Sequence, residues 1–261
     1  MKEVNGGEQK RKLGILGGMG PLASAEFLHT IYRLNIKDPE QNAPACLLYS
    51  DPSMPDRTEA ILRGSTEELT RRVTQALQEL DRMGADRIVI ACVTAHHVLP
   101  DVPEPLRRKV ISLFDLMVDE LLAAPAPSLL LATVGTRRAR LLERQPRWPE
   151  IAPWVRFLDE QDLLGFHTWL YRLKQGRPGD LADLLGWLDT FPARYGLDTL
   201  LFGCTELHLL QRPLATRGGA PAYRIVDPLF VAARDLERLL EAPMPARLPS
   251  LVPDADPPRP S

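Results

Sequence analysis

The chain has 261 residues, 44% of them hydrophobic and 25% charged, which is ordinary for one large globular domain or two smaller ones. A formal net charge of −2 gives no indication of nucleic acid or an anionic membrane as a partner. Three cysteines argue against a disulfide framework, and we find neither a secretory signal nor a membrane-spanning apolar run, so a reducing, cytoplasmic setting is expected.

The first strand is predicted over residues 12–16, and the glycine-rich segment 17–21 follows it directly. Pro21 suits the first turn of a helix, predicted over 22–35, whose N-terminus could hold an anion. Its apolar positions are Leu22, Phe27, Leu28, Ile31 and Leu34. The glycine spacing does not match a dinucleotide-binding loop, so a small carboxylate is the better ligand.

A second strand is predicted over 44–49, and it leads into an irregular loop over 50–58 that contains Arg57. A guanidinium offers a planar fork that matches a carboxylate. The alternative is an arginine that is solvated or braces the loop by pairing with Asp56 or Asp51, and spacing alone favours this alternative.

Residues 65–68, Ser-Thr-Glu-Glu, have the pattern of a capping box at the start of the next helix, which Gly84 ends. Its buried stripe is predicted to be Leu69, Val73, Leu77, Leu80 and Met83.

A buried strand over 88–91 then ends at Cys92, and ligands of open parallel sheets bind beyond the carboxyl ends of strands. His96 and His97 follow, but a zinc site needs at least three ligands, so no metal is expected. His96 is expected to support the site or to cap a helix.

The remaining chain is predicted to repeat this α/β pattern after a crossing at residues 123–127. Helices are expected over 115–122, 161–174, 181–191 and 229–240, a strand begins at 129–131, and 137–156 is read as a short helix with an irregular connection. Lys174 is either a solvated charge at a helix end or a carboxylate contact. Residues 1–11 and the proline-rich 243–261 are expected to be disordered.

The two halves show an internal repeat. Cys204 follows a strand over 199–203 and lies 112 positions after Cys92, and His96 and His208 keep the same offset. Asp115 and Asp227 are also matched at 112, whereas segments 14–20 and 129–135 are offset by 115. A single cysteine would most simply be a buried structural thiol. Two at matched strand ends favour one shared cleft with a cysteine from each half.

The chain resembles the aspartate/glutamate racemase family, the cofactor-independent amino-acid racemases, over roughly residues 13–240. The resemblance is carried by Gly17-Gly18-Met19-Gly20-Pro21, Pro55-Asp56-Arg57-Thr58, Ala91-Cys92-Val93-Thr94-Ala95-His96, Ala132-Thr133-Val134-Gly135-Thr136, Gly203-Cys204-Thr205-Glu206 and Val226-Asp227-Pro228. It implies an α/β fold of two pseudo-symmetric Rossmann-like domains with mostly parallel sheets facing one cleft. The expected domains are 12–115 with 228–242, and 116–227.

The resemblance implies a racemase that needs no pyridoxal phosphate or other cofactor and acts on an amino acid, expected to be acidic. Cys92 and Cys204 would exchange the α-proton from opposite faces, with His96 and His208 in support. Substrate-binding residues would be Met19, Gly20, Arg57, Thr58, Val93, Thr94, Thr133, Thr136, Lys174, Thr205 and Glu206. A homodimer is also expected, with no nucleic acid or membrane partner.

Val93 departs from the family, which usually has an asparagine directly after the first cysteine. A buried polar group left without its partner costs about 1–3 kcal/mol, so a typical substrate is expected to bind less well. This leaves two alternatives open. One is another cysteine-dependent isomerase or decarboxylase of the superfamily with a changed substrate, and the other is a non-catalytic amino-acid-binding homologue.

Overall fold

The structure is a computed structural model that describes residues 10–176, 181–216 and 221–245. The predicted disorder of the two tails therefore falls mainly on residues that lie outside the described ranges. Lys10 and Arg11 are within them, and Arg11 donates to the backbone carbonyl of Leu240. No helix in the described ranges is long and apolar enough to cross a membrane.

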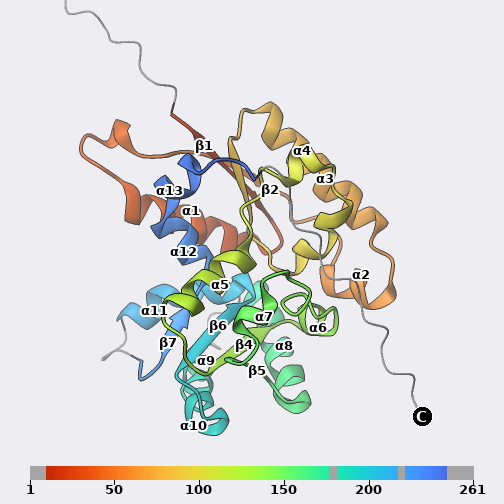
Figure 1. Cartoon of the computed structure of the whole chain (residues 1–261), viewed down its shortest axis with the longest axis vertical. Coiled ribbons are helices and arrows are strands. Elements are labelled where there is room, and N and C mark those ends of the chain that lie inside the picture. Colours follow the sequence, from red (N-terminus) through yellow and green to blue (C-terminus); the bar gives the residue numbers. More distant parts are fainter. Residues whose placement is uncertain (1–9, 177–180, 217–220, 246–261) are drawn as a thin grey trace, which may run out of the picture.

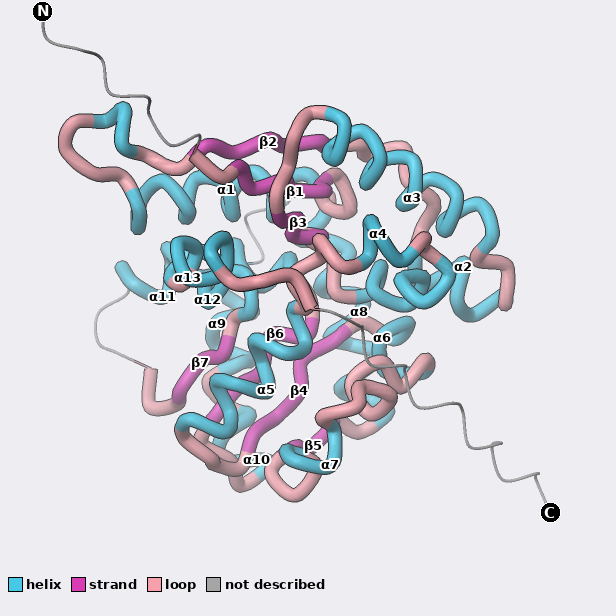
Figure 2. Tube along the Cα trace, turned by 45° about the horizontal axis from the view of Figure 1, so that its top comes forward, coloured by secondary structure: helices cyan, strands magenta, loops and turns pink. Residues whose placement is uncertain are grey.

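Two separate parallel sheets form the centre of the molecule (Figure 2). The first has the order β2-β1-β3, with β1 at Lys12–Gly17, β2 at Ala45–Ser50 and β3 at Arg87–Ile90. The second has the order β5-β4-β6-β7, with β4 at Ser128–Ala132, β5 at Val155–Phe157, β6 at Thr199–Gly203 and β7 at Arg224–Val226. Every strand pair is parallel, which confirms the predicted α/β fold.

Helices connect the strands and cover the sheets (Figure 1). The α-helices are α1 (Pro21–Asn35), α2 (Arg57–Arg63), α3 (Glu67–Arg82), α4 (Glu104–Arg107), α5 (Leu113–Ala123), α6 (Val134–Arg138), α7 (Trp148–Ile151), α8 (Glu160–Lys174), α9 (Leu181–Leu188), α10 (Phe191–Tyr195), α11 (Gln211–Thr216), α12 (Pro228–Arg234) and α13 (Leu236–Glu241). The described residues also form the 3₁₀ segments η1 (Glu40–Asn42), η2 (Thr94–Asp101) and η4 (Thr205–Leu210).

One hydrophobic core joins the two sheets. Ile15 and Val89 of the first sheet belong to the same buried cluster as Leu130 and Leu201 of the second. Two further clusters lie within the separate halves. Burial of apolar surface is the main favourable term in folding, so the shared core holds the halves to each other. The domain boundaries expected from the sequence stay a prediction.

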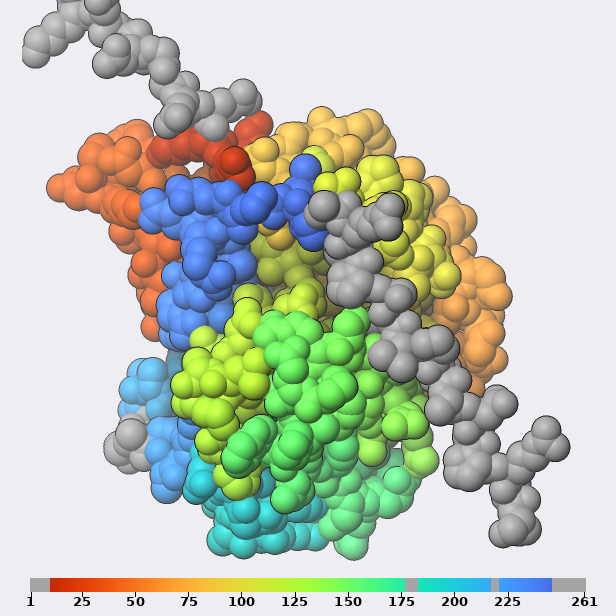
Figure 3. Space-filling model, in the orientation of Figure 1, coloured from red at the N-terminus to blue at the C-terminus, as the bar shows by residue number. Residues whose placement is uncertain are grey.

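The C-terminal helices return to the first half, where α12 and α13 lie beside α1 (Figures 1 and 3). Asn35 Nδ2 donates to the carbonyl of Ala233 at 2.7 Å, and Lys37 forms an ion pair with Glu237 at 3.3 Å. The single helix predicted over 229–240 is wrong, because the chain leaves helical geometry at Asp235.

Several local predictions are corrected by the tertiary environment. In α1, Leu22 and Leu34 are exposed, while the polar Ser24 and Thr30 are buried, because the helix packs between two neighbours instead of presenting one apolar stripe. In α3, Met83 is exposed beyond the buried stripe.

The capping box at 65–68 is not formed, since the N-cap Thr66 makes no side-chain capping hydrogen bond. Gly84 does end α3, with φ of 86°.

Two elements of the second half differ from the prediction. Residues 137–156 are predicted to form a short helix and an irregular connection; the short helix α7 lies within this segment, but Val155–Phe157 forms the edge strand β5, whose short length gives little periodicity. The helix expected over 181–191 is divided into α9 and α10, and Pro192 lies in the first turn of α10.

The repeat is also realigned at one position. In the first half Val110 forms a parallel bridge with Ile88, and in the second half Ile225 pairs with Leu200. Since Ile88 and Leu200 are equivalent positions of the repeat, Val110 is equivalent to Ile225. Two residues further on, Ser112, not Asp115, is therefore equivalent to Asp227. Ser112 is the N-cap of α5 and Asp227 is the N-cap of α12. The equivalence of Asp115 and Asp227 is therefore wrong, because the offset of strand ends is 115 at this point of the chain.

The turn after β1 provides a test of backbone crowding. Gly18 has φ of 90°, and a Cβ there would lie 2.3–2.4 Å from backbone atoms of Asp51, whereas Gly64 has φ of 63° and open space around it. We expect Gly64→Ala to lower the free energy of unfolding by about 1–2 kcal/mol through the left-handed conformation. Gly18→Ala should lower the free energy of unfolding by about 1–3 kcal/mol more than Gly64→Ala does, because its Cβ would overpack against Asp51. Urea unfolding measures the change in the free energy of unfolding of each variant. Equal changes in the two variants would contradict the predicted collision with Asp51.

Candidate active site

The two cysteines each lie just beyond the carboxyl end of a strand, as the sequence predicts. Cys92 follows β3 and Cys204 follows β6, and their exposed fractions are 4% and 2%. Thr205 Oγ1 donates a hydrogen bond to the carbonyl of Ala91 at 3.0 Å. Since Ala91 precedes Cys92 and Thr205 follows Cys204, this bond joins the two cysteine loops across the halves.

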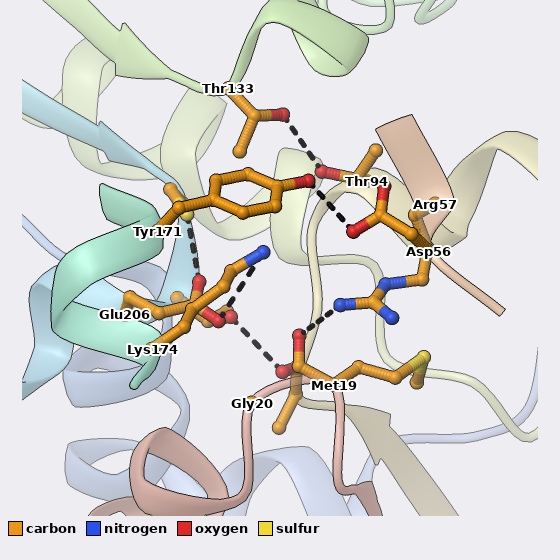
Figure 4. A network of polar contacts seen from close by, with 12 residues as sticks. Met19, Gly20, Asp56, Arg57, Thr94, Thr133, Tyr171, Lys174 and Glu206 are labelled. Atoms are coloured by element: carbon orange, nitrogen blue, oxygen red, sulfur yellow. Dashed lines mark hydrogen bonds and ion pairs between the residues drawn. The ribbon is translucent and has the colours of Figure 1, made fainter. Parts of the chain in front are cut away.

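Cys204 contacts the buried Glu206, which forms an ion pair with the half-buried Lys174; Figure 4 shows Lys174 and Glu206 side by side. The thiol donates to Glu206 Oε2 at 2.8 Å, and Lys174 Nζ lies 3.8 Å from Glu206 Oε1. Burial raises the pKa of the Cys204 thiol well above its ordinary value, and the Glu206 carboxylate raises it further, while Lys174 opposes them. Cys204 therefore keeps its proton at neutral pH.

Lys174 is a carboxylate contact and not a solvated charge. Burial alone would lower the pKa of its ammonium group, but the neighbouring Glu206 carboxylate and Cys204 sulfur outweigh burial and raise it. The charge of Lys174 also interacts with Cys92 and Arg57, so this side chain faces both halves of the site.

Arg57, at the start of α2, is buried with an exposed fraction of 8%. It donates from NH2 to the carbonyl of Met19 at 2.9 Å and from NH1 to that of Pro55 at 3.0 Å, while its Nε has no partner. Burial lowers the pKa of the guanidinium, but Cys92, Asp56 and Glu206 raise it overall, so Arg57 stays charged beside Cys92. Arg57 braces its loop through these backbone carbonyls, whereas Asp51 pairs with Arg72 and Asp56 accepts from Tyr171. Its guanidinium extends toward the Met19 carbonyl (Figure 4).

A triangle of threonine hydroxyls joins the halves on another side of the site. Thr94 Oγ1 lies 3.1 Å from Thr133 Oγ1 and 2.9 Å from Thr136 Oγ1, and all three residues are buried. Thr133 also caps α6 by accepting from the backbone N–H of Thr136 at 3.1 Å. The predicted residues 94, 133 and 136 thus come together and present hydroxyls at one place.

Thr58 and Gly20 are positioned by close backbone approach. A Cβ on Gly135 would lie 2.7 Å from Thr58 Oγ1, so α2 and α6 touch where glycine allows it. A Cβ on Gly20 would lie 2.9 Å from Glu206 Oε1, which places the N-cap of α1 against Glu206. Met19 contributes its carbonyl to Arg57, and its side chain is buried.

Tyr171 and Asp56 complete the site, and the sequence did not single them out as its members. The Tyr171 hydroxyl donates to Asp56 Oδ2 at 2.7 Å, joining α8 to the N-cap of α2. Lys174 Nζ lies 4.5 Å from the centre of the Tyr171 ring, and the His167 ring packs against that ring at a tilt of 55°, with the ring centres also 4.5 Å apart. The spacing of 167, 171 and 174 on one face of a helix was the available signal.

The remaining predicted residues contact the backbone, other buried side chains or the hydrophobic core. His96 Nδ1 donates to the carbonyl of Cys92 at 3.0 Å, so His96 supports its loop. His208 contacts Asp227 and Thr30. Val93 belongs to the hydrophobic cluster that joins the sheets, so the position that usually carries an asparagine is filled here by core packing. No group of three or more potential ligands in the described ranges could hold a metal.

The contact between Cys204 and Glu206 predicts a change in thiol titration. In Glu206→Gln the amide can donate to the sulfur and the negative charge is lost, so the pKa of Cys204 should fall toward its ordinary value. Alkylation of Cys204, followed by peptide mass spectrometry across a pH series, should then begin at lower pH. Cys92 in the same sample is the internal control, and an unchanged Cys204 profile would refute the effect of Glu206.

Burial of His96 predicts an acid-sensitive stability. Burial lowers its pKa to about 4 from 6.5, and the bonds to the backbone of Cys92 and Val93 only partly oppose this. As pH falls below 6.5, the unfolded chain binds a proton that the folded protein accepts only near pH 4. Folded stability should drop by about 3 kcal/mol over this range. The free energy of unfolding, measured with urea at pH 7, 5.5 and 4, should lose less between these pH values in His96→Gln, whose side chain cannot titrate, than in the wild type. An equal loss in both proteins would contradict this role of His96.

Comparison with known proteins agrees with this geometry. The model of the Asp/Glu/Hydantoin racemase family matches residues 16–236. Among solved structures, aspartate racemase from Picrophilus torridus is 22% identical, with a TM-score of 0.69 over 89% of this chain and 100% of that one.

Glutamate racemase from Campylobacter jejuni is 18% identical, with a TM-score of 0.59 over 90% of this chain and 88% of that one. Allantoin racemase from Klebsiella pneumoniae is 15% identical, with a TM-score of 0.60 over 88% of this chain and 88% of that one. At these identities the structural likeness shows the fold, whereas the family match spans most of the chain. The protein therefore belongs to the Asp/Glu/Hydantoin racemase family and is an enzyme of the racemase type.

Proposed function

We propose that the protein racemises an acidic amino acid, aspartate or glutamate, without pyridoxal phosphate and with Cys92 and Cys204 as its two proton-transfer groups. The observation that carries this proposal is the hydrogen bond from Thr205 to the carbonyl of Ala91, at 3.0 Å. It brings together the loops of the two cysteines, which come from different sheets.

The charges around the cysteines support an acidic substrate. Arg57 is a buried cation and Lys174 a half-buried one, their charges interact, and each also interacts with Cys92. A guanidinium and an ammonium so placed are suited to a substrate with two carboxylates. Allantoin, the substrate in the name of one structural relative, has no carboxylate to offer these two cations.

The two thiols have different neighbours. The Cys204 thiol donates a hydrogen bond to the Glu206 carboxylate, which can only accept, so Cys204 begins as the acid. Cys92 lies beside the guanidinium of Arg57, and we assign it the role of the base because Cys204 holds that of the acid.

In the reaction, the Cys92 thiolate takes the α-proton from one face, breaking the C–H bond and forming S–H. The electron pair left on the α-carbon is delocalised into the substrate carboxylate, and the Cys204 thiol then gives its proton to the other face. Cys204 is left as the thiolate, ready for the mirror-image substrate. The hydroxyls of Thr94, Thr133 and Thr136 are preorganised donors for the developing charge.

The family usually has an asparagine where this chain has Val93, which left open a changed substrate or a binding protein. The burial of Val93 in the core, together with the complete set of buried charges, favours a working acidic-substrate site. We further propose a cytoplasmic homodimer with the two α/β domains expected from the sequence.

The proposal predicts exchange of the α-proton in D₂O. Purified protein without pyridoxal phosphate should remove the α-proton NMR signal of both enantiomers of aspartate or glutamate and interconvert them. Cys92→Ala and Cys204→Ala should each lower racemisation by at least about 10³-fold, because one face then lacks its proton carrier. Cys46→Ala is the matched control, since Cys46 is a half-buried thiol on β2 outside the site.

Unchanged racemisation in both single variants would refute the two-cysteine mechanism. Absence of exchange with every acidic amino acid, in folded protein with free thiols, would refute the substrate class. Exchange confined to a neutral amino acid would show that Val93 accompanies a change of specificity.

A further inference from the structure

The two halves place a histidine at the same distance after each cysteine, but the two side chains have different surroundings. His96 and His208 each lie four positions after a cysteine. His96 donates to the Cys92 carbonyl, packs edge-on against Phe114 with ring centres 5.6 Å apart, and its Nε2 has no partner. His208 is fully buried and bonded through both ring nitrogens.

The partners of His208 come from two different parts of the chain. Its Nδ1 lies 2.6 Å from Asp227 Oδ2, and its Nε2 lies 3.0 Å from Thr30 Oγ1. Asp227 also accepts from the backbone N–H groups of Leu229 and Phe230 and from Gln211 Nε2. Because an ionised carboxylate only accepts, Nδ1 carries a hydrogen and the ring is fixed in orientation.

The difference between the histidines has a definite origin in the repeat. At the position of Asp227 the first half has Ser112, whose hydroxyl caps α5 by accepting from the backbone N–H of Asp115. A serine there offers no carboxylate to His96. The second half alone thus combines a helix cap with a partner for the histidine behind its cysteine.

His208 links the Cys204 loop to α1 at a point distant from the substrate site. It lies in η4, which begins directly after Cys204 and contains Glu206. Thr30 lies in the middle of α1, whose N-cap Gly20 approaches Glu206 so closely that a Cβ would be 2.9 Å from Oε1. The same helix therefore meets η4 at two points, one in the site and one at His208.

An Asp-His-Thr series can also describe a nucleophile with its base, but this one cannot act on a substrate. Thr30 has an exposed fraction of 0% inside α1, and His208 is equally buried. The ring of Phe27 lies edge-on to His208, with centres 6.1 Å apart, and covers it further. The arrangement is suited to fixing distance and orientation between two elements.

We propose that His208 is a positioning residue that holds the Cys204-Thr205-Glu206 loop against α1 through Asp227 and Thr30, and so sets the place of the Cys204 sulfur in the closed site. The catalytic part of this inference rests on the proposed function. The geometric part concerns the Cys204 thiol alone and can be measured without turnover.

Two variants break only the link to α1. Thr30→Val keeps the shape of the side chain and removes the hydroxyl, and His208→Asn keeps a donor for Asp227 while losing the reach to Thr30. We expect alkylation of Cys204 to become at least about fivefold faster relative to Cys92, because the loop loses one of its fixed points. In the racemase assay kcat should fall by about 10–100-fold with KM within about threefold, the pattern of a misplaced reacting group.

Ser112→Ala is the matched control, because it removes the equivalent cap in the half that has no such histidine link. It should lower the melting temperature while leaving the ratio of Cys204 to Cys92 alkylation unchanged. His208→Gln, which reaches toward Thr30, should recover part of the kcat lost in His208→Asn.

An unchanged alkylation ratio in Thr30→Val and His208→Asn would overturn the proposal, as would an equal change in Ser112→Ala. The proposed racemisation is tested separately by the wild-type protein. If the wild type shows no α-proton exchange while the alkylation ratio changes as expected, the function is wrong and the positioning role stands.

Discussion

The site depends on bringing two strand ends from two separate sheets to within hydrogen-bond distance of each other. The Thr205 hydroxyl and the Ala91 carbonyl make that contact directly, one residue away from each cysteine. The shared hydrophobic core, which contains residues of β1, β3, β4 and β6, makes the approach stable. A polar contact of this kind contributes only about 1 kcal/mol. The buried core therefore holds the two halves together, and the hydrogen bond fixes how the two cysteine loops are aligned.

Closure of the two halves also creates the electrostatic character of the site. Arg57, Lys174, Glu206 and Asp56 are charged groups with little access to water, and each has a partner that lowers the cost of burial. Burial raises the pKa of Cys204, whereas at Arg57 the neighbouring Cys92, Asp56 and Glu206 outweigh burial and raise the pKa of the guanidinium. The pseudo-symmetric halves thus surround their cysteines with different groups, Glu206 beside Cys204 and Arg57 beside Cys92.

Pseudo-symmetry and divergence can be followed residue by residue. The strand ends, the cysteines and the caps at Ser112 and Asp227 keep their places in both halves. His96 sits in apolar surroundings that hold its pKa near 4, whereas His208 meets a carboxylate and a hydroxyl. Asp227 uses Oδ2 to accept from His208 and Oδ1 to cap α12, whereas Ser112 has a single hydroxyl oxygen, which caps α5.

The parallel α/β fold, the repeat and the positions of Cys92 and Cys204 at strand ends were all predictable from residue order, because apolar runs and glycine turns are local signals. The locations of α1, α3 and α8 were likewise predictable from their spacing. The break at Asp235, the edge strand β5, the exposure of Leu22 and the joining of Tyr171 to Asp56 were not, because each depends on a partner distant in the chain. The burial of Val93 in the core and the identity of Lys174 as a partner of Glu206 were settled by packing between the halves, which sequence spacing does not encode.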